Sequence, residues 1–192
     1  MEARFYTGEK FVNKVFQEDY YARYGEEWEK GKGAKRILKD RDLRYVFIGR
    51  MSIESKSFIV RSFFRLIRHK MAVKRCAEIN FKNIKRGFSL SHGNNIIVNC
   101  NAKIGKYVNL RNGVTIGMEA RGKRKGVPKI GDCVWIGSNA TIVGKIRVGN
   151  NVLIAPNAYV NRNIPDNSIV IGNPAVVIEK KEATKEYIPY IR

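Results

Sequence analysis

The sequence predicts a mainly β protein, a parallel β-helix that follows an α-helical region. Three observations predict the β-helix: an aliphatic residue recurs every six residues, a small or aliphatic residue often follows four positions later, and glycine or asparagine often comes directly after the first. One such unit cannot bury its apolar face alone, so a short repeat is typical of stacked coils. An amphipathic helix would instead repeat its apolar residues about every 3.6 positions.

The six-residue repeat covers residues 84–164, and each of its steps is six residues long except at two breaks. Residues two apart in an extended segment point to the same face, so Val108 and Leu110 are both expected to face the core. Glycine or asparagine tolerates a positive φ and lets the chain turn a corner. The leading aliphatic residues are Ile84, Leu90, Val98, Ile104, Leu110, Ile116, Ile130, Ile136, Ile142, Val148, Ile154 and Val160.

Residues 1–76 lack this repeat and are predicted to form a basic helical N-terminal region. Apolar residues recur at helical spacing between Phe11 and Tyr24, and a second helix is predicted over 42–51. The cluster of Gly31 and Gly33 is expected to interrupt the helical pattern.

A third helix is predicted over 53–75, with an apolar stripe and many basic residues. Two interpretations remain open for it. The stripe packs on the β-helix or on a partner subunit, with the basic face solvated, or the helix lies in the interface of an anionic membrane. The stripe contains Ile59, Phe63, Ile67 and Met71, and the basic residues are Arg61, Arg65, Arg68, Lys70, Lys74 and Arg75.

Composition limits the class of partner and the cellular location. The net charge of +20 in 192 residues indicates a negatively charged partner. Cys76, Cys100 and Cys133 have no metal or redox spacing, which fits a reducing cytoplasm. Residues 1–10 lack the apolar core of a signal peptide, and no apolar run is long enough for a membrane span. A cytoplasmic protein is expected, peripheral at the inner face of the cell membrane under the membrane interpretation.

A basic loop over 118–129 interrupts the repeat at its second break. Long loops inside compact domains are usually functional. The positive cluster in this loop suits the phosphates of a cofactor or an acidic substrate, and a solvated surface loop is the alternative. The cluster contains Arg121, Lys123, Arg124 and Lys125.

His92 lies at the first break, where two extra residues follow Leu90. His69 is the only other histidine in the chain. A neutral imidazole near pH 7 is suited to removing a proton from a hydroxyl group. A single histidine is more often structural, and that alternative is still open at this point.

A set of short motifs within residues 87–175, together with the His92 segment, resembles the hexapeptide-repeat acyltransferases. The closest branch resembles the serine acetyltransferase-like sugar O-acetyltransferases of capsular, exopolysaccharide and lipopolysaccharide biosynthesis. This resemblance covers about half of the chain and implies a left-handed parallel β-helix over 77–175, with a charged tail over 176–192. The motifs are Ile96-Ile97-Val98, Ala102-Lys103-Ile104-Gly105, Gly113-Val114-Thr115-Ile116-Gly117, Pro128-Lys129-Ile130-Gly131, Val134-Trp135-Ile136-Gly137 and Gly172-Asn173-Pro174-Ala175.

The resemblance also implies a homotrimer that holds acetyl-CoA, its co-substrate, between neighbouring β-helices. In such an enzyme His92 deprotonates the acceptor hydroxyl, which attacks the thioester directly. Glu78, about one coil earlier, is the expected acidic residue that orients His92 and stabilises the imidazolium. The backbone N–H of Gly117, or one beside it, is expected to bind the developing oxyanion.

The same resemblance assigns binding residues. Ser138, Pro156 and Arg162 match positions along the pantetheine and nucleotide path of CoA, and Lys180 is expected to reach the 3′-phosphate. The expected substrate-binding residues are Ser91, Asn94, Arg121 and Arg124.

Departures from the family pattern decide the expected acceptor. Serine acetyltransferases carry Asp where this chain has Ser91, and Arg-His where it has Gly126 and Val127. The groups that bind the ammonium and carboxylate of an amino acid are therefore missing. A sugar hydroxyl of an acidic or lipid-linked glycan is the expected acceptor.

Two alternatives remain from the sequence: a serine O-acetyltransferase of cysteine biosynthesis, and a non-catalytic β-helix binding protein. A metal enzyme of hexapeptide-repeat type would need three histidine ligands, but the chain contains only His69 and His92, so no metal site is expected. No recognised nucleic-acid-binding motif accompanies the charge, so no nucleic-acid partner is expected.

Overall fold

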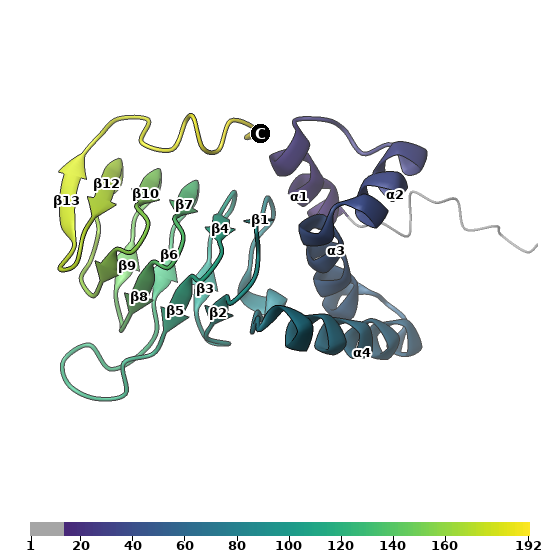
Figure 1. Ribbon diagram of the computed structural model, residues 1–192, viewed down its shortest axis with the longest axis horizontal. Coiled ribbons are helices and arrows are strands. Elements are labelled where there is room, and N and C mark those ends of the chain that lie inside the picture. Colours follow the sequence, from purple (N-terminus) through teal and green to yellow (C-terminus); the bar gives the residue numbers. More distant parts are fainter. Residues whose placement is uncertain (1–13) are drawn as a thin grey trace, which may run out of the picture.

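The computed structural model describes residues 14–192, as a group of helices followed by a coiled run of short strands (Figure 1). Phe11, at the start of the first predicted helix, lies outside the described residues. The helices are α1 (Lys14–Tyr24), α2 (Lys30–Lys39), α3 (Arg41–Glu54) and α4 (Phe58–Arg75).

Two details of the helical region differ from the sequence prediction. Gly31 and Gly33 do not interrupt a helix, because they lie inside α2, and a Cβ atom at Gly33 would lie 2.4 Å from the Trp28 ring. Glycine therefore allows the helix to approach the indole closely. The third predicted helix begins later than residue 53, because α3 ends at Glu54 and the Ser57 side chain caps α4.

Each turn of the coil contributes to up to three parallel sheets, which gives a triangular β-helix. Sheet 1 has the strand order β1-β4-β7-β10-β12-β13, sheet 2 is β11-β8-β5-β2 and sheet 3 is β3-β6-β9. Only β13 is antiparallel to its neighbour among these described strands. The strands are β1 (Ser89–Ser91), β2 (Ile97–Val98), β3 (Lys103–Ile104), β4 (Asn109–Arg111), β5 (Thr115–Gly117), β6 (Lys129–Ile130), β7 (Val134–Ile136), β8 (Thr141–Val143), β9 (Arg147–Val148), β10 (Val152–Ile154), β11 (Tyr159–Val160), β12 (Ser168–Ile171) and β13 (Val176–Glu179).

The repeat of six arises because aliphatic residues stack in columns inside the β-helix. In sheet 1, Leu90 pairs with Leu110, Leu110 with Ile136, Ile136 with Ile154, and Ile154 with Val170. All five side chains are buried. Each coil therefore buries its apolar face against the coils above and below it.

A buried ion pair joins the helices to the first coil. Arg50 of α3 donates to Asp19 of α1 at 2.7 Å, and to the carbonyl oxygens of Ile84 and Lys85, both at 2.7 Å. Asp19 also accepts from the backbone N–H of Phe88 at 2.8 Å. Burial raises the pKa of Asp19, and the Arg50 charge opposes that rise. The two charges are satisfied only when α1, α3 and the first coil are packed together.

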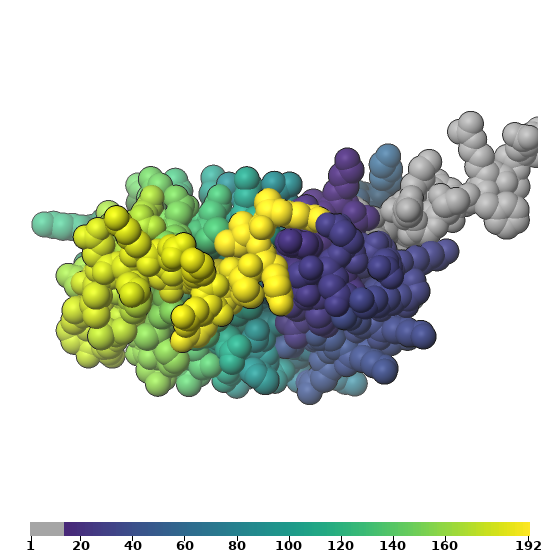
Figure 2. Space-filling view, turned by 90° about the horizontal axis from the view of Figure 1, so that it is seen from above, coloured from purple at the N-terminus to yellow at the C-terminus, as the bar shows by residue number. Residues whose placement is uncertain are grey.

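The C-terminal segment packs along the outside of sheet 1. The sequence predicts a charged tail over 176–192, whereas the structure forms β13 and then runs back across the coils to the helical region (Figure 2). Ala183 and Ile188 pack with Trp135 on this face, and Arg192 forms an ion pair with Glu18 of α1 at 3.0 Å. This segment therefore covers part of the outer face of sheet 1.

In the part of the chain that the structure describes, residues 14–192, no helix is both long enough and apolar enough to cross a membrane.

We predict that Arg50→Ala lowers the free energy of unfolding by about 3–5 kcal/mol, because it leaves the Asp19 carboxylate buried without its partner. Urea titration measures this change. Lys185→Ala, which removes an exposed pair with Glu182, is the control and is expected to cost less than about 1 kcal/mol. Equal effects of the two substitutions would contradict the role of Arg50 in joining the helices to the first coil.

Candidate active site

His92 occupies the turn by which the chain leaves sheet 1 after β1 and enters sheet 2 at β2. Its φ of 56° lies in the left-handed region, as does that of Asn95, and the His92 carbonyl oxygen accepts from the N–H of Asn94 at 2.7 Å. Positive φ recurs at this corner in later coils, at Asn139 and Asn157, so the His92 conformation belongs to the corner geometry of the β-helix. The imidazole is exposed at this corner, which leaves it accessible to a substrate.

A second buried ion pair holds the His92 turn. Arg75, the last residue of α4, donates to Asp42 of α3 at 2.8 Å and to the carbonyl oxygen of Gly93 at 2.7 Å. The Gly93 N–H donates to the same carboxylate at 3.3 Å, and the Asn95 N–H donates to the Arg75 carbonyl at 2.8 Å. We call Arg75, Asp42 and these backbone groups the Arg75 clamp. The clamp fixes the turn on both sides of Gly93, directly after His92.

The Arg75 clamp has no signal in the sequence, from which Arg75 is expected only as part of a basic helix face. Arg75 and Asp42 are 33 residues apart, and no local pattern links residues at that separation. Their burial shows a specific role, since a buried charge requires a partner.

The first corner, between sheets 1 and 2, carries His92 and continues along the β-helix. The Asn94 carbonyl accepts from Gly113 of the next coil at 2.9 Å, and the Ser138 carbonyl accepts from Asn157 at 2.9 Å. Ser138 and Pro156, predicted to bind CoA, therefore lie on successive coils at this corner. We define the first corner as residues 92–95, 112–113, 138–139 and 156–157.

Ser91 and Ser138 make polar contacts near the first corner. The Ser91 hydroxyl accepts from the Asn109 side chain at 3.3 Å, and the Ser138 hydroxyl donates to Asn112 at 2.8 Å. Ser91 is half-buried and Asn94 is exposed. Ser91 and Asn94 lie beside His92 in the chain, and their role in substrate binding stays a prediction, as does the role of Ser138 in CoA binding.

The second corner, between sheets 2 and 3, carries the other predicted binding residues. Gly117 ends β5 on this side, where its carbonyl accepts from Gly144 at 3.4 Å. Arg162 is exposed there and donates to the carbonyl of Ala175 at 2.6 Å. We define the second corner as residues 99–102, 118–128, 144–145 and 161–163.

The basic loop at the second corner is closed on itself. The backbone N–H groups of Glu119 and Gly126 each donate to the other's carbonyl, at 3.0 and 2.9 Å. The Glu119 carboxylate pairs with Arg124 at 3.1 Å, and Arg121 is exposed. The loop thus has internal structure and presents Arg121 on the surface.

Within one chain, His92 and Gly117 are far apart, although acetyl transfer is expected to use both. His92 lies at the first corner and Gly117 at the second, with one width of sheet 2 between the corners. At about 3.3 Å per extended residue, that width is on the order of 10–15 Å. Lys180 lies elsewhere again, because its N–H donates at 2.8 Å to Asn167, at the corner between sheets 3 and 1.

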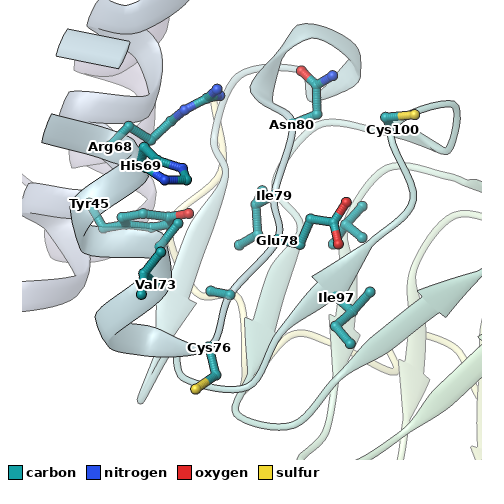
Figure 3. Close-up of a pocket in the computed structure, with 13 residues that line it drawn as sticks. Tyr45, Arg68, His69, Val73, Cys76, Glu78, Ile79, Asn80, Ile97 and Cys100 are labelled. Carbon is teal, nitrogen blue, oxygen red and sulfur yellow. The ribbon is translucent and has the colours of Figure 1, made fainter. Parts of the chain in front are cut away.

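Glu78 lies one coil before β2, bridged in parallel to Ile97, and its side chain is exposed. It lines a pocket with Tyr45 and His69, which Figure 3 shows between α4 and the first coil. The described residues contain no hydrogen bond between Glu78 and His92. Glu78 is stacked on Ile97 of sheet 2 and not on the His92 turn, and its role in orienting His92 stays a prediction.

No group of three His, Cys, Asp or Glu residues within 14–192 is placed to hold a metal ion.

Comparison with known proteins identifies the repeat. Residues 128–162 match the family model described as bacterial transferase hexapeptide (six repeats). The matched segment corresponds to the regular repeats between β6 and β11. Serine acetyltransferase 2 of Arabidopsis thaliana is 32% identical over 119 residues, which are 56% of this chain and 37% of the relative. The chain spans less than two thirds of the length of the curated relatives it matches.

Solved structures confirm the fold class. Serine acetyltransferase of Neisseria gonorrhoeae has a TM-score of 0.72 at 24% identity, over 92% of this chain and 69% of that chain. A serine acetyltransferase solved in complex with CoA has a TM-score of 0.65 at 21% identity, over 85% and 68%. The chain is a left-handed parallel β-helix with a helical N-terminal region. These relatives are serine acetyltransferases, and they do not show the closeness to sugar O-acetyltransferases that the sequence predicts.

We predict that Asp42→Ala frees the His92 turn and lowers the free energy of unfolding by about 3–5 kcal/mol, because Arg75 loses its buried partner. Amide hydrogen exchange should accelerate at Gly93 and Asn95, which the Arg75 clamp holds. Glu119→Ala, at the exposed pair with Arg124, is the matched control. Unchanged exchange at Gly93 in Asp42→Ala would show that the clamp does not hold the turn.

Proposed function

We propose that this chain is an acetyl-CoA-dependent O-acetyltransferase with His92 as its general base. The observation that carries the proposal is an exposed His92 at a β-helix corner, in a turn whose backbone the buried Arg75 clamp holds at Gly93 and Asn95. The family match and the similarity to serine acetyltransferases, one of them solved with CoA, support it.

In the proposed reaction, His92 accepts the proton of the acceptor hydroxyl while that oxygen attacks the thioester carbonyl carbon. The C–S bond then breaks, and the imidazolium returns the proton to the departing sulfur. An acetyl ester and free CoA are the products. Glu78 is proposed to stabilise the imidazolium, and the N–H of Gly117, or one beside it, to bind the oxyanion.

We further propose a homotrimer, because the first corner of one protomer would then meet the second corner of its neighbour. At such a seam, His92 of one protomer would lie near Gly117 of its neighbour, whereas the two residues of a single chain are far apart. The covered face of sheet 1 supports this arrangement, since the seam would use other faces. Ser138, Pro156 and Arg162 are proposed to line the CoA path along that seam. Lys180, Arg121 and Arg124 are proposed to bind acidic groups of CoA or of the acceptor.

Two acceptors have support. The comparisons favour L-serine, since the relatives reported above are serine acetyltransferases. A sugar hydroxyl is favoured by Ser91, Gly126 and Val127, which carry no charge where the resembled family binds an amino acid. Gly126 has a φ of 136° and closes the basic loop through its backbone, so this position serves loop geometry.

We propose that α4 also contacts an anionic membrane surface. The apolar stripe predicted from sequence is divided: Ile67 and Met71 pack toward the core, whereas Ile59 and Phe63 are 79% and 58% exposed. Leu66 extends the exposed stripe, and basic residues of the helix flank it. An exposed apolar stripe with a positive border complements anionic lipid.

We predict that His92→Ala lowers acetyl transfer by about 10²- to 10⁴-fold, the typical contribution of a general base, while CoA affinity is unchanged. CoA release measured with a thiol reagent, over serine and sugar acceptors, reports the transfer, and calorimetry reports CoA binding. Lys185→Ala, at an exposed residue of the C-terminal segment, is the control. Full transfer by His92→Ala would overturn the proposed mechanism, and no transfer by the unaltered chain to any acceptor would favour a binding protein.

For the membrane proposal, we predict that the double variant Phe63→Ser and Leu66→Ser loses cosedimentation with phosphatidylglycerol vesicles, because both exposed side chains are removed without a change in charge. Phosphatidylcholine vesicles should bind neither protein. Retained binding by the double variant would show that charge alone, or another surface, holds the vesicle.

A further inference from the structure

A cavity of about 540 Å³ lies between α4 and the first coil, on the outer face of sheet 2 (Figure 3). Arg68, His69 and Tyr45 line it from the helical side, and Glu78 and Asn80 line it from the coil. Its volume is within the range of about 300–1,000 Å³ that is typical of ligand sites. A single serine would leave much of this space unfilled.

Tyr45 places at this cavity a hydrogen-bond donor without an acceptor in the described part of the chain. Its side chain is fully buried, and its hydroxyl has no hydrogen-bond partner among residues 14–192. Figure 3 shows the hydroxyl pointing toward the cavity from beneath His69. Burial raises the pKa of Tyr45, so the group is a neutral donor at physiological pH. A buried donor without an acceptor is unfavourable, and an acceptor atom of a bound molecule would satisfy it.

The charges around the cavity define the chemistry of that molecule. Arg75 is engaged by the clamp, whereas Arg68 forms no ion pair with the described part of the chain. Arg68 is therefore available for an acidic group. Asn80 on the opposite wall can donate through its side-chain amide, since its oxygen already accepts from the Lys82 N–H at 3.1 Å, and Ile97 contributes apolar surface. A sugar ring matches this arrangement, because each hydroxyl both donates and accepts hydrogen bonds.

We infer that this cavity binds an acidic sugar unit of the acetyl acceptor, with its carboxylate at Arg68 and a ring oxygen or hydroxyl accepting from Tyr45. The inference rests on the proposed acetyl transfer and selects the sugar over serine. Ile97, on the cavity wall, belongs to β2, the strand that directly follows the His92 turn.

The test is titration of the full-length protein with D-glucuronate and D-galacturonate, followed by the amide NMR signals of Glu78 and Asn80. D-glucose, D-galactose and L-serine are the reference probes. We expect both signals to shift with at least one uronate, and the neutral counterpart to bind more weakly. Tyr45→Phe should weaken uronate binding roughly three- to tenfold, the effect of one hydrogen bond. Arg68→Gln should remove the preference for the uronate, and Arg65→Gln, an exposed neighbour on α4, should not.

Tyr45→Phe also separates binding from folding. It removes a hydroxyl that is unpaired among the described residues, so the melting temperature should not fall, and a purely structural role would leave uronate binding unchanged. Unshifted Glu78 and Asn80 signals with both uronates, or equal affinity in Tyr45→Phe, would overturn the inference. Acetyl transfer to serine without uronate binding would contradict the assignment of the cavity to an acidic sugar and leave the proposed activity intact. Uronate binding without acetyl transfer would remove the proposed activity and leave the cavity assignment intact.

Discussion

The candidate active site depends on charges that are buried between the helices and the first coil. Folding removes water from two ion pairs, Arg75 with Asp42 and Arg50 with Asp19. Only the specific partners of these charges compensate for the lost hydration. Both arginines also donate to backbone carbonyls of the β-helix region. The helical region therefore sets the conformation of the turn that presents His92.

The stacked coils give the site its second property, a fixed alignment along the corners. Each coil repeats the backbone position of the previous one, so residues far apart in sequence, such as Asn94 and Ser138, lie along the same edge. The same regularity holds His92 and Gly117 at different corners of one chain. A reaction that uses both groups therefore requires a neighbouring protomer, which is why the trimer is part of the proposed mechanism.

The sequence predicted what local periodicity determines and missed what long-range contacts determine. Stacked aliphatic positions such as Leu110 and Ile136 follow directly from the repeat of six, and the turn at His92 follows from its first break. Helix α2 was missed because Gly33 was interpreted as a break, whereas it makes room for Trp28. The Arg75 clamp and the Tyr45 hydroxyl, which has no partner among residues 14–192, depend on packing between distant segments, for which a single sequence contains no signal.

The most direct test of the account is a crystal structure of the protein with bound CoA. We predict a trimer in which the CoA sulfur lies about 3–3.5 Å from the His92 imidazole, or one water molecule away, with Gly117 of the neighbouring protomer on the other side of the thiol. CoA bound within one protomer and remote from His92, or a monomer that is active in solution, would contradict it.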